Sequence, residues 1–426
     1  MKWDAKLWRQ SQEQFKNFIS PLVAGLGRSE RRQAGARYVE GLLLPGQRKS
    51  IGPMAERLGV DGQQLQQFVT DSPWDEQEIW RLIAREVVPS LEPIEAWVVD
   101  ETGWLKQGEH SVGVSAQYCG AVGKKANCQV SVEVVVSDGV VAAPIAGRLY
   151  LPEGWTKDAA RRAKAGVPAE VVFQTKIEIA LDLIRQALAH GVPRAPILAD
   201  SLYGDSTDFR EALRGLDCEF FVQVSGVGHK AWPEPVITER KTKRYHVVAS
   251  TPPSQTLEEI AAGFKESDWK ACQWKAADGK TRHTRLAWHQ IYLAHSMRKA
   301  DGKPEESWLV ADWPAGQAEP YHYYLAHFKT APTKARCLRL SRSRFHIEQY
   351  FQRAKDDLGF DHYEGRSWRG FHHHLVLSAL AYLFVLVAYL RAKKNFWCDV
   401  GADAARDPTV AAEVDRLLLL LPQKIR

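Results

Sequence analysis

The spacing of apolar and polar residues divides the chain into helical and strand-rich regions. Over residues 1–92, apolar residues recur at the helical period and strand signals are few. Short β-rich runs separated by Gly-containing turns begin at residue 93. The helical period returns after residue 332. The pattern predicts an α/β protein with helical regions at both ends.

Within the first region, residues 50–74 have the organisation of a helix-turn-helix. Ala55 lies where two helices would cross, Gly59 can adopt the positive φ of a sharp turn, and Leu65 anchors the second helix. That helix is rich in Gln, a side chain that can read base edges in a major groove. A plain helical hairpin fits the same pattern, and both interpretations stay open.

The middle of the chain alternates strands and helices. Three strand runs suggest an antiparallel meander, and the Pro- and Gly-rich residues 144–155 are typical of a loop. A helix, a short strand, a second helix and a fifth strand are then predicted, a common mixed α/β layout. The strand runs are 95–102, 110–120, 128–139, 195–205 and 218–225, and the helices are 171–191 and 206–216.

Residues 226–332 predict a β-rich insertion domain. Six of the fifteen Trp residues lie in it, and RYHVVAS (244–250) is one of its strand signals. Residues 333–392 return to helices, and 393–426 are predicted as a helical tail. The apolar run 375–390 is shorter than the roughly 20 residues that span a bilayer, so we expect a buried core helix there.

Charge is concentrated in one part of the chain. The net charge of the 426 residues is only +6. Residues 329–355, however, contain eight Lys or Arg residues and the single acid Glu348, which gives about +7. A basic cluster of this kind is expected in proteins that bind a polyanion such as nucleic acid.

Several other classes of protein are disfavoured. The six Cys residues form no CxxC pair, so neither a zinc site nor a disulfide framework is expected. Three consecutive His residues (372–374) suggest a metal site, but no second ligand cluster lies nearby in sequence. The N-terminus has no apolar segment of a secretion signal, so we expect a cytoplasmic protein.

Three acidic residues occupy positions where carboxylates are chemically informative. Asp100 lies in an apolar strand, and Asp200 ends another. Each alone can be a turn former, but groups at the ends of neighbouring strands meet at one crevice, where paired carboxylates require a cation. Glu348 shares a helix stripe with Arg344 and Lys355, a pattern that a solvated helix face also produces. Together the three acids predict a site for Mg²⁺, which prefers oxygen ligands.

At these residues the sequence resembles bacterial insertion-sequence transposases of the DDE superfamily. The cut-and-paste group carries the signature Y-x2-R-x3-E-x6-K, matched here by Arg344, Glu348 and Lys355, with Ser341 in the Tyr position. The segments VVDETG and ILADSLYG resemble the family's two Asp segments. The resemblance implies an RNase H-like mixed-sheet catalytic core, residues 93–225 and 333–392, split by the insertion domain and preceded by a DNA-binding region.

The resemblance also implies the chemistry. Asp100, Asp200 and Glu348 are expected to hold two Mg²⁺ ions, with Mn²⁺ as a substitute, for DNA cleavage and strand transfer. Double-stranded DNA is the expected partner, bound by a homodimer in the bacterial nucleoid. The expected DNA-backbone contacts are Arg344, Lys355, Arg336, Arg339, Arg342 and Arg353. Two alternatives stay open, a domesticated DNA-binding protein that does not cleave and an RNase H-like nuclease without strand transfer.

Overall fold

The computed structural model describes residues 5–234, 253–276, 279–294 and 304–400. Contacts group the chain into two units. Unit 1 comprises residues 1–93, 101–193 and 346–426, and unit 2 comprises residues 94–100 and 194–345. The boundary at residue 100 falls inside strand β1 (Ala96–Leu105), so this strand contributes residues to both units.

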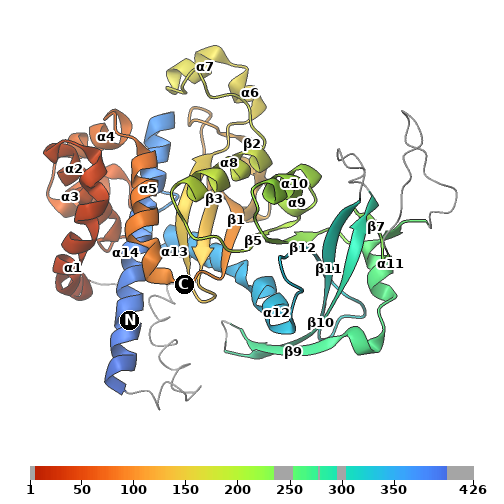
Figure 1. Cartoon of the computed structure of the whole chain (residues 1–426). Helices are drawn as coiled ribbons and strands as arrows, with labels where there is room; N and C mark the ends of the chain where they lie inside the picture. Colours follow the sequence, from red (N-terminus) through yellow and green to blue (C-terminus); the bar gives the residue numbers. More distant parts are fainter. Residues whose placement is uncertain (1–4, 235–252, 277–278, 295–303, 401–426) are drawn as a thin grey trace. The chain divides into compact units, whose positions relative to one another are not determined.

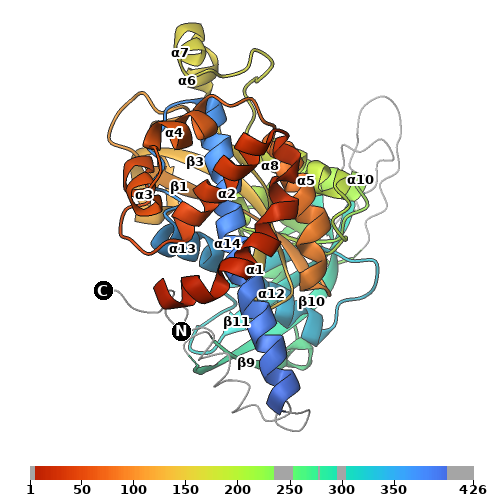
Figure 2. The same cartoon turned by 90° about the vertical axis from the view of Figure 1, so that its left-hand side faces the viewer.

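The helical part of unit 1 surrounds one long helix, α14 (Trp368–Val400). This helix contacts α1, α2, α4 and α5, which are red and orange beside the blue α14 in both views (Figures 1 and 2). Residues 368–392 are long and apolar enough to cross a membrane, but 72% of the most apolar window is buried. The core helix expected at 375–390 is therefore confirmed, and it is longer than the apolar run. The surrounding helices are α1 (Ala5–Val23), η1 (Ala24–Leu26), α2 (Ser29–Leu43), α3 (Ile51–Leu58), α4 (Gly62–Thr70), α5 (Glu76–Glu86) and η2 (Val88–Leu91).

Residues 50–74 contain two helices, α3 and α4, joined by a short turn, as both interpretations of this segment predict. Gly59 follows α3 with φ 63° and ψ 36°, the left-handed conformation that favours glycine. Asp61 caps α4 by accepting a hydrogen bond from the backbone N–H of Gln63. Leu65 is buried, whereas the four Gln side chains of α4 are exposed.

The strands of unit 1 centre on β3 (Lys124–Ser137). Its neighbours are β1 on one side and, on the other, β2 (Ser115–Cys119) and β4 (Ala142–Leu149), both antiparallel to β3. The prediction of a loop at 144–155 was wrong in its first half, because β4 pairs with β3 across a register shift at Val134/Val135. The remaining elements of unit 1 are η3 (Gly120–Val122), α6 (Glu153–Thr156), α7 (Ala159–Lys164), α8 (Lys176–Ala189) and, from residue 346, α13 (Phe345–Leu358).

Unit 2 contains the parallel strands β1, β5 (Ile197–Ala199) and β6 (Phe220–Val224). Strand order continues from β6 through β12, β11, β10 and β7 to β8, and β9 pairs with β10. Parallel and antiparallel pairs therefore coexist, which confirms the α/β class and is consistent with an RNase H-like fold. The expected strand at 244–250 lies outside the described residues, as do 401–426 of the predicted helical tail.

The other elements of unit 2 connect or cover these strands. They are α9 (Ser201–Gly204), α10 (Thr207–Gly215), β7 (Lys230–Trp232), β8 (Gln255–Thr256), α11 (Leu257–Ala262), η4 (Glu266–Asp268), β9 (Lys270–Lys275), β10 (Thr281–Leu293), β11 (Glu305–Pro314), β12 (His322–His327) and α12 (Lys334–Ser343).

Candidate active site

Two of the three predicted metal ligands occupy matching positions on adjacent parallel strands of unit 2. In the β1–β5 pair, Trp97 lies opposite Ile197 and Val98 opposite Leu198. Continuing this register by two residues brings Asp100 opposite Asp200. Neighbouring strands lie about 4.8 Å apart, and residues that are opposite each other point to the same face. This register places Asp100 and Asp200 at neighbouring positions of the two chain segments, and their joint role as metal ligands stays a prediction.

Asp200 also has a local structural role. The strand β5 ends at Ala199, and Asp200 accepts a hydrogen bond of 3.0 Å from the backbone N–H of Leu202 at the start of α9. The turn-forming role of an Asp after an apolar strand is thus realised here. It does not compete with metal binding, since a carboxylate has two oxygens and about four acceptor positions.

A guanidinium compensates the charge of Asp100. Arg344 Nη1 donates to Asp100 Oδ2 at 3.0 Å, and the two side chains are 31% and 14% exposed. Side-by-side carboxylates repel, and a cation between them is the expected solution. Arg344 follows α12 with φ −58° and ψ −33° and precedes α13. Arg344 therefore keeps helical dihedral angles at the junction of the two helices, directly before the helix that carries Glu348.

The donor set at Asp100 and Asp200 suits a hard divalent cation, because both offer carboxylate oxygens. Among the residues that the structure describes, however, no group of three or more His, Cys, Asp or Glu side chains is arranged to hold a metal ion. Glu348 belongs to α13 of unit 1, whereas both aspartates belong to unit 2. Its role as third ligand stays a prediction.

The helix that carries Glu348 is fixed to the strands of unit 1 by its buried face. Ile347, Tyr350, Phe351, Ala354 and Leu358 form that face, and Glu348 is exposed on the opposite one. Tyr350 Oη donates a 2.9 Å hydrogen bond to the carboxylate of Glu133, which is fully buried on β3. Burial raises the pKa of Glu133 to about 7, although the hydrogen bonds from Tyr350 and Ser131 act in the opposite direction.

Lys355 is directed into unit 1. Its Nζ donates to Thr102 Oγ1 at 2.6 Å and to the carbonyl oxygen of Gly103 at 2.9 Å. Burial lowers the pKa of this ammonium group. Lys355 therefore attaches α13 to β1, the strand that also carries Asp100, and its predicted contact with DNA stays a prediction.

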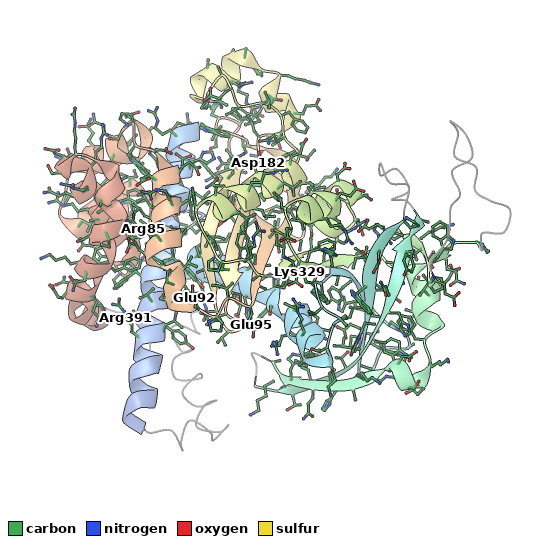
Figure 3. All side chains as sticks on the ribbon, in the orientation of Figure 1. Arg85, Glu92, Glu95, Asp182, Lys329 and Arg391 are labelled. Carbon is green, nitrogen blue, oxygen red and sulfur yellow. The ribbon has the colours of Figure 1, made fainter. Side chains whose placement is uncertain are left out.

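The other arginines of the basic cluster in unit 2 are paired with acids that are distant in sequence. Arg336 contacts Glu219 at 2.8 Å, Arg339 contacts Glu95 at 3.3 Å, and Arg342 contacts the buried Asp312 at 2.6 Å. Figure 3 labels Glu95. These acids and Asp100 lie outside residues 329–355, for which the charge of about +7 was counted. The count therefore overestimates the net positive charge around these arginines in the fold. Arg353 is half-buried on α13.

Comparison with known proteins identifies the family. Residues 21–284 match the sequence profile of the family described as DDE superfamily endonuclease, which is more than half of the chain and includes Asp100 and Asp200. The chain belongs to the DDE superfamily. Glu348 and the rest of the predicted signature lie beyond the matched residues.

This DDE protein is also similar to an insertion-sequence protein. It is 33% identical over 181 residues to the probable transposase for insertion sequence element IS701 of Microchaete diplosiphon. The similar part is 42% of this chain and 44% of the relative, so the chain covers less than half of the relative's length. The similarity to insertion-sequence transposases that the motifs indicated is confirmed.

Sequence reasoning on this DDE protein missed Glu133 and the residues that bind it. Glu133 receives a 2.9 Å hydrogen bond from Ser131 Oγ, which in turn accepts one of 3.0 Å from Trp104 Nε1. The signal was available, because a single carboxyl group interrupts the apolar run VSVEVVVS of β3. Such a residue is buried only when its oxygens are hydrogen-bonded.

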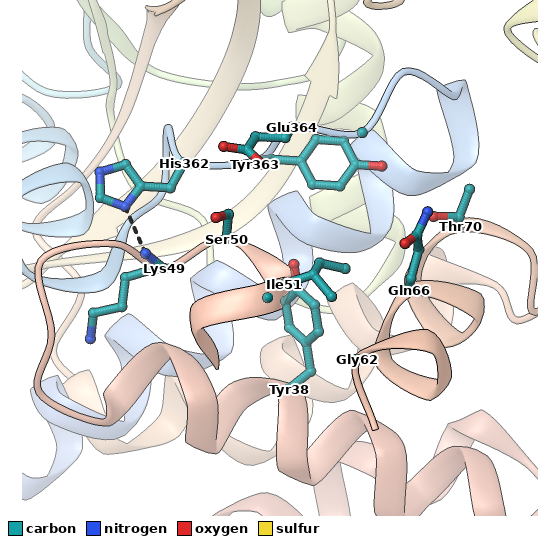
Figure 4. A pocket seen from close by; sticks show the side chains of 12 residues that line it. Tyr38, Lys49, Ser50, Ile51, Gly62, Gln66, Thr70, His362, Tyr363 and Glu364 are labelled. Carbon is teal, nitrogen blue, oxygen red and sulfur yellow. Dashed lines mark hydrogen bonds between the residues drawn. The ribbon is translucent and has the colours of Figure 1, made fainter. Parts of the chain in front are cut away.

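A cavity of 390 Å³ adjoins α3 and α4 of this DDE protein (Figure 4). It is lined by Ser50 before α3, Gln66 of α4 and the loop that contains His362 and Tyr363. The backbone N–H of Lys49 donates to His362 Nδ1 at 3.1 Å, the dashed line in Figure 4. Lys49 Nζ donates to the Leu42 carbonyl at 2.6 Å, and burial lowers its pKa to about 8. The loop after α13 is therefore hydrogen-bonded to the segment that precedes α3 and α4, the helices predicted to contact DNA.

Proposed function

We propose that this protein is a DNA transposase that binds the terminal inverted repeats of a mobile element, cleaves DNA strands at the element ends and joins them to target DNA. The observation that supports this most directly is the register that brings Asp100 opposite Asp200. Membership of the DDE superfamily and the similarity to an insertion-sequence transposase point in the same direction.

Asp100, Asp200 and Glu348 are the proposed ligands of two Mg²⁺ ions, for which Mn²⁺ can substitute. The case for Glu348 is the spacing R-x3-E-x6-K alone. Bound ions of this kind activate the attacking oxygen and stabilise the leaving oxygen in phosphoryl transfer.

The chain's own cations have separate tasks in this proposal. A guanidinium carries five N–H donors, so Arg344 can contact Asp100 and a DNA phosphate at the same time. Arg336, Arg339, Arg342 and Arg353 are further proposed phosphate contacts. The first three must retain or exchange their carboxylate partners when DNA binds.

The helix-turn-helix is the proposed reader of the terminal repeat. The four exposed Gln side chains of α4 can donate to and accept from base edges, most favourably to adenine. We further propose that a homodimer holds two element ends and that the protein acts on the bacterial nucleoid in the cytoplasm.

Substitution of the carboxylates tests the proposal. Asp100→Asn and Glu348→Gln should each abolish Mg²⁺-dependent nicking of DNA that carries the element ends, while duplex binding persists. Glu101→Gln is the matched control, because Glu101 is the next residue of β1, points to the other face and pairs with Lys176 at 2.7 Å. Wild-type nicking by Asp100→Asn contradicts the proposal.

The products of the same assay separate the alternatives. Joined donor and target strands indicate a transposase, and hydrolysed ends without joining indicate a nuclease. Binding to the ends without nicking by the wild-type protein indicates a non-cleaving DNA-binding protein.

A further inference from the structure

Two lysines of unit 1 carry charge that the protein does not neutralise. Lys124 and Lys125 lie at the tip of the β2–β3 hairpin, where residues 120–125 are all exposed. Residues 115–127 contain no acid. Within the described residues neither lysine makes an ion pair, in contrast to Arg336, Arg339 and Arg342. Their field therefore extends into solvent.

The hairpin places an aromatic ring beside one of these lysines. Tyr118 lies opposite Lys125 in the β2–β3 register, so both side chains project from the same face. Tyr118 is 59% exposed. Gly123, with φ 63°, closes the tip in the left-handed conformation. An exposed ring next to a cation is suited to contact sugars or bases beside a phosphate.

The hairpin adjoins a cavity of 760 Å³ in the same unit. Asn127 Nδ2 donates to the carbonyl oxygens of Lys106 and Gly108 at 2.9 and 3.0 Å, and residues 105–108 line the cavity. Arg366 also lines it and is exposed, with no ion pair among the described residues. Lys124 is three residues from Asn127, about 10 Å along the strand.

The same cavity is also lined by a residue that lies shortly before α3. Arg48, two residues before Ser50, lines it and pairs with Glu364. The segment His362–Glu364 lines both this cavity and the 390 Å³ cavity beside Gln66 of α4 (Figure 4). The 361–366 loop therefore lies between α3 and α4 on one side and, on the other, residues 105–108, to which Asn127 of the hairpin is hydrogen-bonded.

We infer that this surface, defined by Arg366, Lys124, Lys125 and Tyr118 and called here the hairpin track, binds the phosphate backbone of the DNA duplex that α3 and α4 engage. The inference rests on the proposed function and adds a second DNA contact to it, outside the predicted signature. Charge complementarity specifies the partner, because the track's cations make no ion pair within the described part of the chain and a DNA duplex carries a dense row of phosphates.

Salt-dependent binding tests the track. Each phosphate contact contributes about 0.9 to the slope of log K against log salt concentration. Lys124→Ala/Lys125→Ala should therefore reduce the slope for duplex DNA by about 1.8 and Arg366→Ala by about 0.9. When the salt concentration rises from about 50 to about 200 mM, the affinity of the wild type should fall by a factor about 12 times larger than the affinity of the double variant.

The matched control removes the same charge elsewhere in unit 1. Lys157→Ala/Lys164→Ala also lowers the net charge by two, but Lys157 is paired with Glu153 and both lysines lie at α6 and α7. Its slope should remain that of the wild type. Lys124→Arg/Lys125→Arg keeps both positive charges and should have the wild-type slope. This variant therefore separates the effect of lost charge from an effect of misfolding.

Each result has a distinct meaning. A wild-type slope in Lys124→Ala/Lys125→Ala, with the wild-type protein bound to duplex, overturns the hairpin track and leaves the proposed function intact. Equal slope changes in the control and the track variant also overturn it, because net charge then accounts for both. Absence of duplex binding by the wild-type protein overturns the proposed function and the track together.

Discussion

His374 provides a pH-dependent contribution to stability that can be measured. Its Nδ1 accepts a 2.9 Å hydrogen bond from Tyr38 Oη, and its Nε2 donates to the carbonyl oxygen of Phe360 at 3.0 Å. The neutral imidazole satisfies both partners in this arrangement. The side chain is fully buried, and burial lowers its pKa to about 3. Protonation would therefore place an unsolvated charge in the core.

The size and sign of the effect follow from linkage. The ring has its ordinary pKa of 6.5 when unfolded and about 3 when folded. Above pH 6.5 both states are neutral and the contact contributes fully. As pH falls below 6.5 only the unfolded state binds a proton, so stability is lost. At pH 5 the loss is 1.5 pH units at about 1.36 kcal/mol each, or about 2 kcal/mol.

The adjacent histidines add contacts in other directions. His372 Nε2 accepts from the backbone N–H of Leu149 at 3.3 Å, and burial lowers its pKa in the same sense. The two ring nitrogens of His373 face the carbonyl oxygens of Val69 and Trp74. These hydrogen bonds favour the protonated ring, but burial has the larger effect and lowers the pKa of His373 to about 4. The three rings thus fix α14 to its neighbours by hydrogen bonds with other parts of unit 1.

Urea unfolding between pH 8 and pH 5 tests the argument. His374→Gln retains one donor and one acceptor but cannot titrate, so the pH-dependent loss should be about 2 kcal/mol smaller than in the wild type. Tyr38→Phe is the control, because it removes a hydrogen bond worth about 1 kcal/mol and leaves the imidazole in place. Equal losses in the wild type and His374→Gln, or an NMR titration of His374 near 6.5 in the folded protein, would refute the reasoning.

Four further substitutions have predicted outcomes in equilibrium unfolding. Tyr350→Phe leaves the buried Glu133 with one donor fewer and should cost about 1–3 kcal/mol. Gly59→Ala should cost about 1–2 kcal/mol, since its φ is 63°, whereas Gly52→Ala inside α3 should stabilise by about 0.5–1 kcal/mol. Gly204→Ala should cost about 3 kcal/mol or more, because a Cβ there would collide with a carbonyl oxygen of β6.

Local turn chemistry and strand ends were predictable from the sequence because each depends on a few neighbouring residues. The turn at Gly59, the strand that stops before Asp200 and the helix that begins after Ser206 are examples. Strand β4 was not predictable in this way. Pro144 and Gly147 are typical of loops, and only pairing with β3 makes the segment a strand.

The basic cluster illustrates why electrostatics was harder to predict than the position of the aspartates. Asp100 and Asp200 could be singled out because an acid inside or directly after an apolar strand is visible in the sequence, and the parallel pairing of β1 with β5 then brings the two positions into register. The partners of the arginines are acids such as Glu219, about 117 positions from Arg336, whose proximity arises only from the sheet. A count of charges along the chain treats such cations as available. In the fold Arg336, Arg339 and Arg342 are paired with carboxylates, whereas Lys124 and Lys125 make no ion pair within the described residues. A proposal for which cations contact DNA therefore has to consider which of them are paired with carboxylates in the folded protein. The salt slopes of the Lys124 and Lys125 variants test whether unpaired cations are the ones that contact DNA.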